Sequence, residues 1–254
     1  MAIKITWLAH SAFALEIDGH SILIDPFVTG NPLAPYPVDD LYPEYILVSH
    51  GHGDHVGDTV DIVARTGAAT ISNVEISGWL RHHGVKNAHG QNTGGCADYG
   101  FMTVKFTQAF HSSSLPDGSY GGMPNGFIIT GGGYRLYFAG DTALFGDMAL
   151  IGDEGIDLAF LPIGDYFTMG VDDAVRAVTL IRPRLVLPMH YNTFPPIQQQ
   201  AGIWANRVSS ETDAQPIVLD PGQSYSLQPG AGRSETRTAE QRSVVPVGMR
   251  RPYG

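Results

Sequence analysis

The feature that most constrains this chain is a short segment, residues 50–55, with the sequence HGHGDH. It directly follows residues 45–48 (YILV), an apolar run typical of a buried strand, and it precedes a predicted helix. Four such side chains cannot share one face of a regular element, but a tight turn can bring them together. We expect Gly51 and Gly53 to give that turn its dihedral angles and to leave room beside a metal ion. Because imidazole and carboxylate groups bind zinc and its neighbours, the segment predicts a metal site.

A simpler interpretation makes the segment a polar loop in which Asp54 only caps the following helix. A lone histidine would fit that interpretation. Three histidines and one aspartate within six residues favour metal binding instead.

The rest of the chain alternates short apolar runs with amphipathic segments, which predicts strands and helices in alternation. Strands are expected over residues 3–8, 12–17, 21–24, 45–48, 102–106, 127–130, 134–138, 158–161 and 185–187. Helices are expected over residues 56–64, 76–83 and 172–181. We expect two comparable halves that divide near residues 112–126, and an α/β fold in which a pair of mixed sheets has helices outside.

Composition changes near the end of the chain. Residues 1–227 are expected to form one domain, whereas residues 228–254 are rich in Arg, Pro and Gly and predict a tail that is flexible or contacts another subunit. The start has no signal-peptide pattern, and no apolar run approaches the roughly 20 residues that cross a bilayer. The single cysteine, Cys96, fits a reducing cytosol and is expected to be buried. We therefore expect a cytoplasmic protein.

The acidic balance of the chain limits its partners. A formal net charge of −10 would repel a polyanion from most of the surface, so general nucleic-acid binding is not expected. Small anionic substrates stay open, because bound divalent ions would reverse the sign of the field inside a site.

The segment HGHGDH resembles the HxHxDH signature of the metallo-β-lactamase superfamily, and further motifs follow over residues 3–227 in that family's order. Asp25 follows an early strand, and His111, Asp141 and His190 stand where the family has its later ligands. Within the family the chain is similar to small metal-dependent hydrolases related to ascorbate-6-phosphate lactonase. That similarity rests on residues 7–13 (WLAHSAF), 162–165 (PIGD) and 167–170 (FTMG).

The resemblance implies an αββα sandwich and two divalent metal ions, zinc or manganese first, with iron and nickel as alternatives. One ion would be held by His50, His52 and His111, and the other by Asp54, His55 and His190. Asp141 would be shared between them, and Asp25 would support the ligand turn. His52 stands where di-iron relatives carry glutamate, and Asp141 stands where the commonest zinc β-lactamases carry cysteine. No inserted nuclease domain separates Asp141 from His190, and all seven ligands favour a filled pair.

This ligand set predicts a hydrolase in which hydroxide bound by two metal ions attacks a small ester, lactone or phosphodiester. Asp54 is expected to orient the hydroxide as well as bind metal. His10 either contacts substrate or donates a proton to the leaving group, or it only hydrogen-bonds a strand end. Asp165 and Asn192 either fix a ligand imidazole or satisfy the backbone of a loop, and residues 191–194 are expected at the rim of the pocket. Relatives in this branch tend to associate, so the resemblance leaves a homo-oligomer open without deciding the oligomeric state.

Two other functions remain open from the sequence. An iron-dependent oxidoreductase on the same fold would bind iron tightly and consume oxygen. A non-catalytic metal-binding protein would be expected to have lost ligands, and here no ligand is missing.

Overall fold

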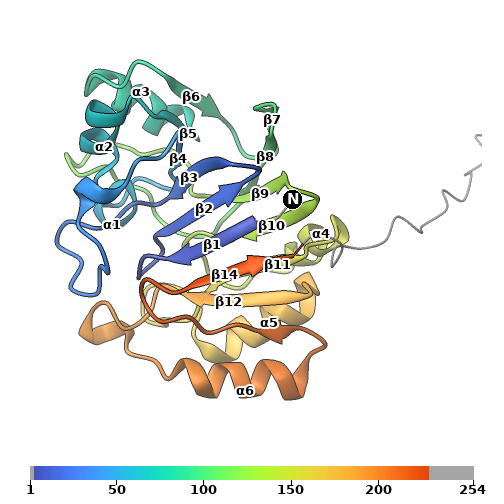
Figure 1. Ribbon diagram of the computed structural model, residues 1–254. Helices are drawn as coiled ribbons and strands as arrows, with labels where there is room; N and C mark the ends of the chain where they lie inside the picture. Colours follow the sequence, from blue (N-terminus) through green and yellow to red (C-terminus); the bar gives the residue numbers. More distant parts are fainter. Residues whose placement is uncertain (1–2, 229–254) are drawn as a thin grey trace, which may run out of the picture.

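A computed structural model describes residues 3–228, which form two seven-stranded sheets packed face to face (Figure 1). The first sheet has the order β14 (Ser224–Leu227), β1 (Ile3–Trp7), β2 (Phe13–Ile17), β3 (His20–Ile24), β4 (Tyr45–Leu47), β5 (Ala69–Asn73) and β6 (Ala88–Gln91). The second has the order β13 (Gln215–Pro216), β12 (Leu185–Met189), β11 (Leu158–Pro162), β10 (Tyr134–Phe138), β9 (Asn125–Gly131), β8 (Met102–Gln108) and β7 (Cys96–Asp98).

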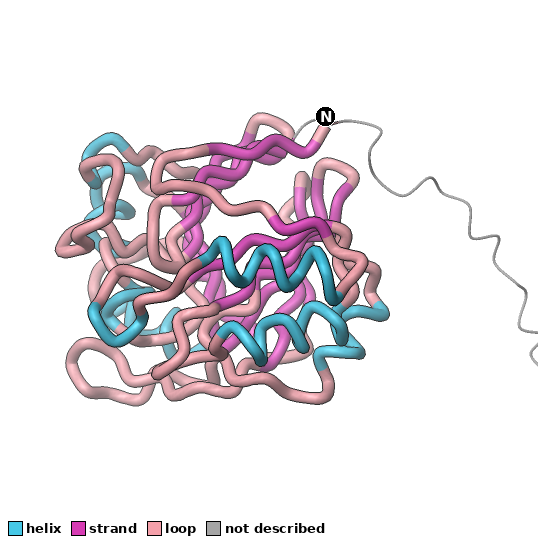
Figure 2. Tube along the Cα trace, turned by 90° about the horizontal axis from the view of Figure 1, so that it is seen from below, coloured by secondary structure: helices cyan, strands magenta, loops and turns pink. Residues whose placement is uncertain are grey.

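The helices lie outside the pair of sheets, as Figure 2 shows from below. They are α1 (Gly53–Val56), α2 (Thr59–Thr66), α3 (Val74–His82), α4 (Met148–Asp153), α5 (Val171–Ile181) and α6 (Ala201–Glu211), with 3-10 turns at Val38–Asp40 and Pro195–Ile197. Helices α2 and α3 cover the first sheet, and α4, α5 and α6 pack on the second. The expected α/β architecture of two mixed sheets with helices outside is confirmed.

An aromatic and aliphatic core fills the space between the sheets. The pattern of β1 shows why: Ile3, Ile5 and Trp7 are buried, whereas Lys4 is exposed. Across the core, the ring of Phe13 packs edge-on against Phe160 with centroids 4.7 Å apart. A smaller core lies under α2 and α3, where Ile62 and Leu80 belong to the cluster that covers the outer face of the first sheet.

The division between the two sheets differs from the expectation. The chain passes from the first sheet to the second between β6 and β7, before residues 112–126, and β14 returns to pair with β1 at the end (Figure 1). The segment rich in Gly and Ser instead joins β8 to β9 within one sheet. Its composition marks a loop correctly, but a loop that joins neighbouring antiparallel strands is no boundary between sheets.

Two local expectations were also wrong. The helix expected over 56–64 is divided into α1 and α2 at Gly57, which has φ 45° and ψ −131°. A Cβ there would lie 2.3 Å from the carbonyl oxygen of Pro26, so only glycine fits. Cys96 is exposed on the edge strand β7 rather than buried.

Strand direction determines where functional side chains can meet. In the first sheet, four strands run in the same direction, namely β1, β3, β4 and β5. In the second sheet, the same is true of β8, β10, β11 and β12. The segments that leave their carboxyl ends contain residues such as His10, Asp25, His50, His111 and His190. In α/β proteins, ligands bind beyond the carboxyl ends of such strands.

The tail predicted for residues 228–254 lies outside the described residues except for Gln228. Within residues 3–228, no helix combines the length and the apolar character that crossing a membrane requires.

Candidate metal centre

Seven side chains from both sheets meet at the edge formed by these strand ends. They are His50, His52, Asp54, His55, His111, Asp141 and His190. Oδ2 of Asp141 lies centrally, 2.9 Å from Nε2 of His190 and 3.3 Å from Nε2 of His55. The same oxygen lies 3.5 Å from Nε2 of His111 and 4.0 Å from Nε2 of His50. Asp141 and three of these four histidines are buried.

Candidate ligand atoms that lie within 4.8 Å of one another form three groups; one joins Asp25 to His50 and His55, and two more lie around Asp141. One of these two contains His50, His52 and His111. The other contains Asp54, His55 and His190 together with His10. These are the trios that the family resemblance implies, with Asp141 reaching both.

Three buried atoms of the candidate ligands lack hydrogen-bond partners among the described residues, namely Nε2 of His55, Oδ1 of Asp141 and Nδ1 of His190. Buried polar atoms in proteins are almost always paired, so unpaired ones gathered at one centre call for a ligand. Imidazole nitrogens and carboxylate oxygens are ligands for zinc and related cations. The residues present therefore fit divalent metal ions.

Asp25 fixes the orientation of the ligand turn. Its carboxylate accepts hydrogen bonds from the backbone N–H of Ser49 at 2.7 Å, from the Ser49 hydroxyl, and from Nδ1 of His55 at 2.7 Å. Since a carboxylate accepts these bonds, Nδ1 of His55 carries the proton and Nε2 faces the centre. The Ser49 hydroxyl gives its proton to Asp25 and so accepts from Nδ1 of His50 at 3.0 Å. One buried carboxylate thereby directs Nε2 of both histidines toward Asp141.

The protonation states of the centre follow from burial and charge. Burial lowers the pKa of His50 well below its ordinary value, and it lowers the pKa of His52 and His111 too. Burial opposes the charge on His55, but Asp141 and Asp25 outweigh it and raise the pKa of His55 well above its ordinary value. The protein alone therefore keeps a proton on His55, which a bound cation would displace.

Both carboxylates of the centre favour the ionised form. Burial opposes the charge on Asp141, yet His190 and His55 hold its pKa well below the ordinary range. Burial also opposes ionisation of Asp54, but the hydrogen bond from His10 and the charge of His55 lower its pKa.

Asp54 does not serve as a helix cap. The residue preceding α1 is His52, and no side-chain hydrogen bond caps this helix. Instead, Oδ2 of Asp54 accepts a hydrogen bond from Nε2 of His10 at 3.1 Å. The side chain of Asp54 remains 31% exposed, so it faces both the buried His10 and the open side of the centre.

His10 is fully buried, and its ring contacts Asp54 instead of lying at the rim of the centre. Burial lowers the pKa of His10 to about 4, so the neutral ring donates from Nε2 and accepts at Nδ1 from the Thr193 hydroxyl at 2.9 Å. Its backbone carbonyl accepts from Nε1 of Trp7 and from the N–H of His190, each at 3.0 Å. The carbonyl of His10 makes the backbone hydrogen bonds expected at a strand end, whereas its ring hydrogen-bonds Asp54.

Strained backbone is concentrated at this edge of the fold. His10 and His190 each have φ 55°, and Asp25 has φ 45°, which side chains other than glycine rarely adopt. Such conformations persist where the surrounding structure enforces them, and they gather at functional sites.

Asp165 and Asn192 make no hydrogen bond to a ligand imidazole among the described residues. Oδ1 of Asn192 accepts from the backbone N–H of Gln199 at 2.8 Å, and Asp165 is exposed in a turn closed by its own backbone. Nδ1 of His190 has no hydrogen-bond partner in the described part of the chain. Asn192 thus matches the other alternative, in which the side chain satisfies the backbone of a loop.

Three contacts at the centre were missed by sequence reasoning. Ser49 links Asp25 to His50, Thr193 holds His10, and the hydroxyl of Ser112 lies 3.2 Å from Nε2 of His52. Each follows or precedes a candidate ligand closely in sequence, which was the available signal. The special dihedral angles expected for Gly51 and Gly53 are not found, because neither residue has a positive φ.

A cleft of about 400 Å³ opens onto the centre. Its lining contains His52, Asp54, His111, Asp141 and His190 together with Phe167, Phe194 and Pro196. Of residues 191–194, which were expected at the rim of the pocket, Phe194 lines the cleft. Tyr191 is buried and stacks on Trp7, with ring centroids 5.2 Å apart.

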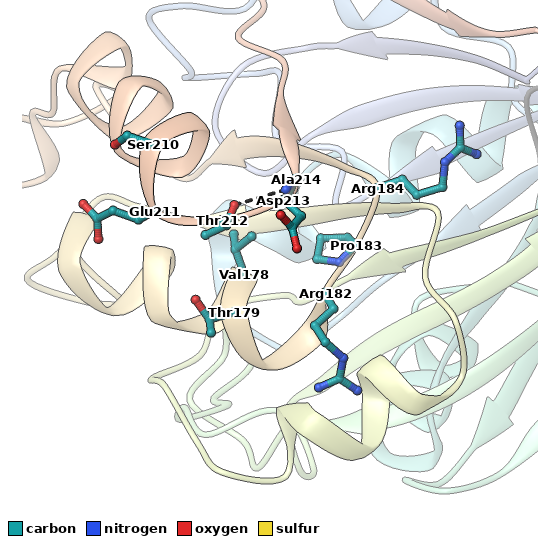
Figure 3. Close-up of a pocket in the computed structure, with 10 residues that line it drawn as sticks. All are labelled: Val178, Thr179, Arg182, Pro183, Arg184, Ser210, Glu211, Thr212, Asp213 and Ala214. Carbon is teal, nitrogen blue, oxygen red and sulfur yellow. Dashed lines mark hydrogen bonds between the residues drawn. The ribbon is translucent and has the colours of Figure 1, made fainter.

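Two larger hollows lie elsewhere on the surface. One of about 580 Å³, drawn in Figure 3, is lined by the ends of α5 and α6 and by Arg182 and Arg184. These arginines pair with Asp153 and Asp157. Another of about 770 Å³ is lined by residues that include Asp172 and Arg207, which also pair. Neither lining contains a histidine, so size alone does not identify the functional site.

Known proteins share this arrangement. Residues 4–190 match the model of the β-lactamase superfamily domain. A UPF0173 metal-dependent hydrolase from Deinococcus radiodurans is 48% identical over 229 residues, which cover 89% of this chain and 100% of that protein. One from Thermus thermophilus is 47% identical over 221 residues, covering 87% of this chain and 97% of that protein.

A solved structure extends the similarity to three dimensions. Igni18, a metallo hydrolase from the archaeon Ignicoccus hospitalis, has a TM-score of 0.83 at 38% identity and covers 90% of this chain and 99% of that one. The family model and these relatives span the strands and turns that build the centre. The chain therefore belongs to the β-lactamase superfamily, in its UPF0173 group, and is a metal-dependent hydrolase.

Proposed function

We propose that this hydrolase binds two divalent metal ions, zinc or manganese, and cleaves a small ester, lactone or phosphodiester. The observation that carries the proposal is the position of Asp141 Oδ2, within 4.0 Å of imidazole nitrogens from both trios. A single carboxylate oxygen between two groups of ligands is the arrangement that a bridged pair of cations requires.

The residues of the centre divide the chemical work. When bound, the cations would provide hydroxide at neutral pH and polarise the oxygen of the bond to be cleaved. Asp54 lines the cleft in its ionised form and is held by His10, so it is suited to accept a hydrogen bond from the attacking water and to orient it. His10 does not line the cleft, and we assign it the positioning of Asp54 in place of a direct contact with substrate.

The cleft limits the substrate to a small molecule. Its volume of about 400 Å³ lies within the range of small-molecule sites. The net charge of −10 also disfavours a polymer of nucleotides.

Metal analysis combined with an activity screen tests the proposal. The purified chain, loaded with zinc or manganese, is expected to hold about two ions and to hydrolyse members of a panel of lactones, bis-nitrophenyl phosphate and cyclic nucleotides. Chelation should abolish turnover, and restored metal should return it. Tightly bound iron with oxygen uptake and no hydrolysis would overturn the proposal in favour of an oxidoreductase.

A further inference from the structure

The cleft has one chemically distinct wall. Beside the metal-binding floor stand Phe167, Phe194 and Pro196, and these are its only lining residues outside the ligand set. Phe167 is 51% exposed, although a large apolar side chain is normally buried. An exposed apolar surface next to a reactive centre is a characteristic of ligand sites.

Charge gives a second, independent observation. Among the described residues that line the cleft there is no lysine or arginine, and the ionisable groups besides histidine are Asp54 and Asp141. A phosphate or carboxylate on the part of the substrate away from the reacting bond would find no cationic side chain there. Anionic groups in proteins are normally held by arginine, lysine or backbone N–H groups.

The loop that presents Phe167 is held rigidly against the centre. Asp165 and Tyr166 both have positive φ, 62° and 46°, a strained pair of residues in succession. The N–H of Asp165 donates to the carbonyl of Met169 at 3.0 Å, and the N–H of Met169 donates to the carbonyl of Thr142, which follows Asp141, at 3.1 Å.

The start of the same loop packs against another ligand. A Cβ on Gly164 would lie 2.1 Å from the carbonyl oxygen of His190, so the loop approaches that ligand's backbone as closely as glycine permits. The second ring of the wall is fixed too, since Phe194 packs edge-on against His10 with centroids 5.6 Å apart.

We propose that Phe167, Phe194 and Pro196 select substrates whose non-reacting part is apolar and uncharged, in preference to phosphorylated or carboxylated ones. This inference rests on the proposed function and specifies its substrate class. An exposed phenylalanine that a strained turn presents at the cleft gains from its position only if a ligand covers it.

Binding of hydroxamates to the zinc-loaded full chain tests the inference without relying on turnover. The probes are acetohydroxamate, hexanohydroxamate, and a hydroxamate of the same length that ends in a phosphonate. Hexanohydroxamate is expected to bind about tenfold more tightly than the phosphonate probe. Its apolar end can cover the wall, whereas a charged phosphonate would lose hydration there without a cationic partner. Phe167→Ala should remove most of that advantage.

Tyr42→Ala is the matched control, because Tyr42 is also an exposed aromatic residue, belongs to another loop and does not line the cleft. It should keep the wild-type ratio of affinities. Tighter binding of the phosphonate probe, or equal effects of the two substitutions, would overturn the inference.

The same experiment separates this inference from the proposed function. Acetohydroxamate has no tail, so its binding reports only that the centre holds metal. Metal-loaded protein that hydrolyses nothing in the screen contradicts the proposed function. In that case the ratio of probe affinities still shows whether the wall prefers an apolar tail to a charged one. Protein that never takes up metal overturns both.

Discussion

At the scale of single residues, hydrogen bonds from neighbouring side chains orient several of the candidate ligands. Asp25 and Ser49 orient His55 and His50, and Thr193 orients His10, which in turn holds Asp54. Partners that orient ligands matter because a rotated imidazole or carboxylate no longer points at a metal. Two residue-scale predictions follow from the pair of His10 and Asp54.

Replacing Asp54 with asparagine keeps its size but removes its charge. We expect Asp54→Asn to lower kcat about 100-fold or more, because an amide is a poor acceptor for the proton of the attacking water. Metal content, measured by mass spectrometry of the elements, should fall much less than kcat. Wild-type turnover by a variant that still holds its metals would contradict the role assigned to Asp54.

Removing the hydroxyl of Thr193 frees the ring of His10 without touching the cleft. Thr193→Val is expected to lower kcat about tenfold with little change in KM, since Asp54 loses its fixed orientation. Thr193→Ser keeps the hydroxyl and should restore kcat. If both variants lose kcat equally, packing rather than the hydrogen bond is responsible.

At the scale of elements, the ligand turn depends on the break between α1 and α2. Gly57 makes that break, and Asp58 then accepts hydrogen bonds from the N–H groups of Val28 and Thr29, each at 2.9 Å. The loop after β3, which contains Asp25, is thereby tied to the end of the ligand turn. A continuous helix over 56–64, which the hydrophobic pattern predicts, would not allow this contact.

Gly57→Ala tests the break. We expect it to lower the free energy of unfolding by about 3 kcal/mol, because a Cβ would collide with the Pro26 carbonyl and the dihedral angles exclude other residues. Gly67→Ala is the control: Gly67 ends α2 with φ 75° and has open space around its Cβ position, so it should cost only about 1 kcal/mol. Equal losses in denaturant unfolding would show that collision at Gly57 is unimportant.

At the scale of the whole molecule, the two sheets meet at a centre that contains unpaired buried polar atoms and a protonated His55 in the absence of metal. Ligands reach this centre from both sheets, with His50 after β4 and Asp141 and His190 after β10 and β12. A cation bound there would join the two halves of the sandwich and stabilise the folded chain.

Metal binding should therefore raise thermal stability. With zinc at about 100 times its dissociation constant, we expect the Tm to rise by about 5–10 °C, measured by calorimetry, and chelator to reverse the rise. His190→Ala, which removes a contributor from the second sheet, should reduce the response. A Tm that is independent of metal would contradict this account.

The sequence by itself determined the ligand turn, because its residues are neighbours along the chain and their chemistry is specific. It also predicted most strands that are long or strongly apolar, such as Leu158–Pro162. It failed for Ala69–Asn73, a fully buried strand with Thr, Ser and Asn among its five residues, whose composition resembles a loop. Burial between β4 and β6 in the first sheet overrides that local preference.

Only the tertiary structure decided which partners the ligands have. The hydrogen bond between His10 and Thr193 joins residues 183 positions apart, and that between His10 and Asp54 joins residues 44 apart. The apolar wall likewise combines Phe167 with Phe194 from separate loops. Such contacts depend on how two sheets pack and on strained turns at their edge, and neither property is encoded by spacing along the chain.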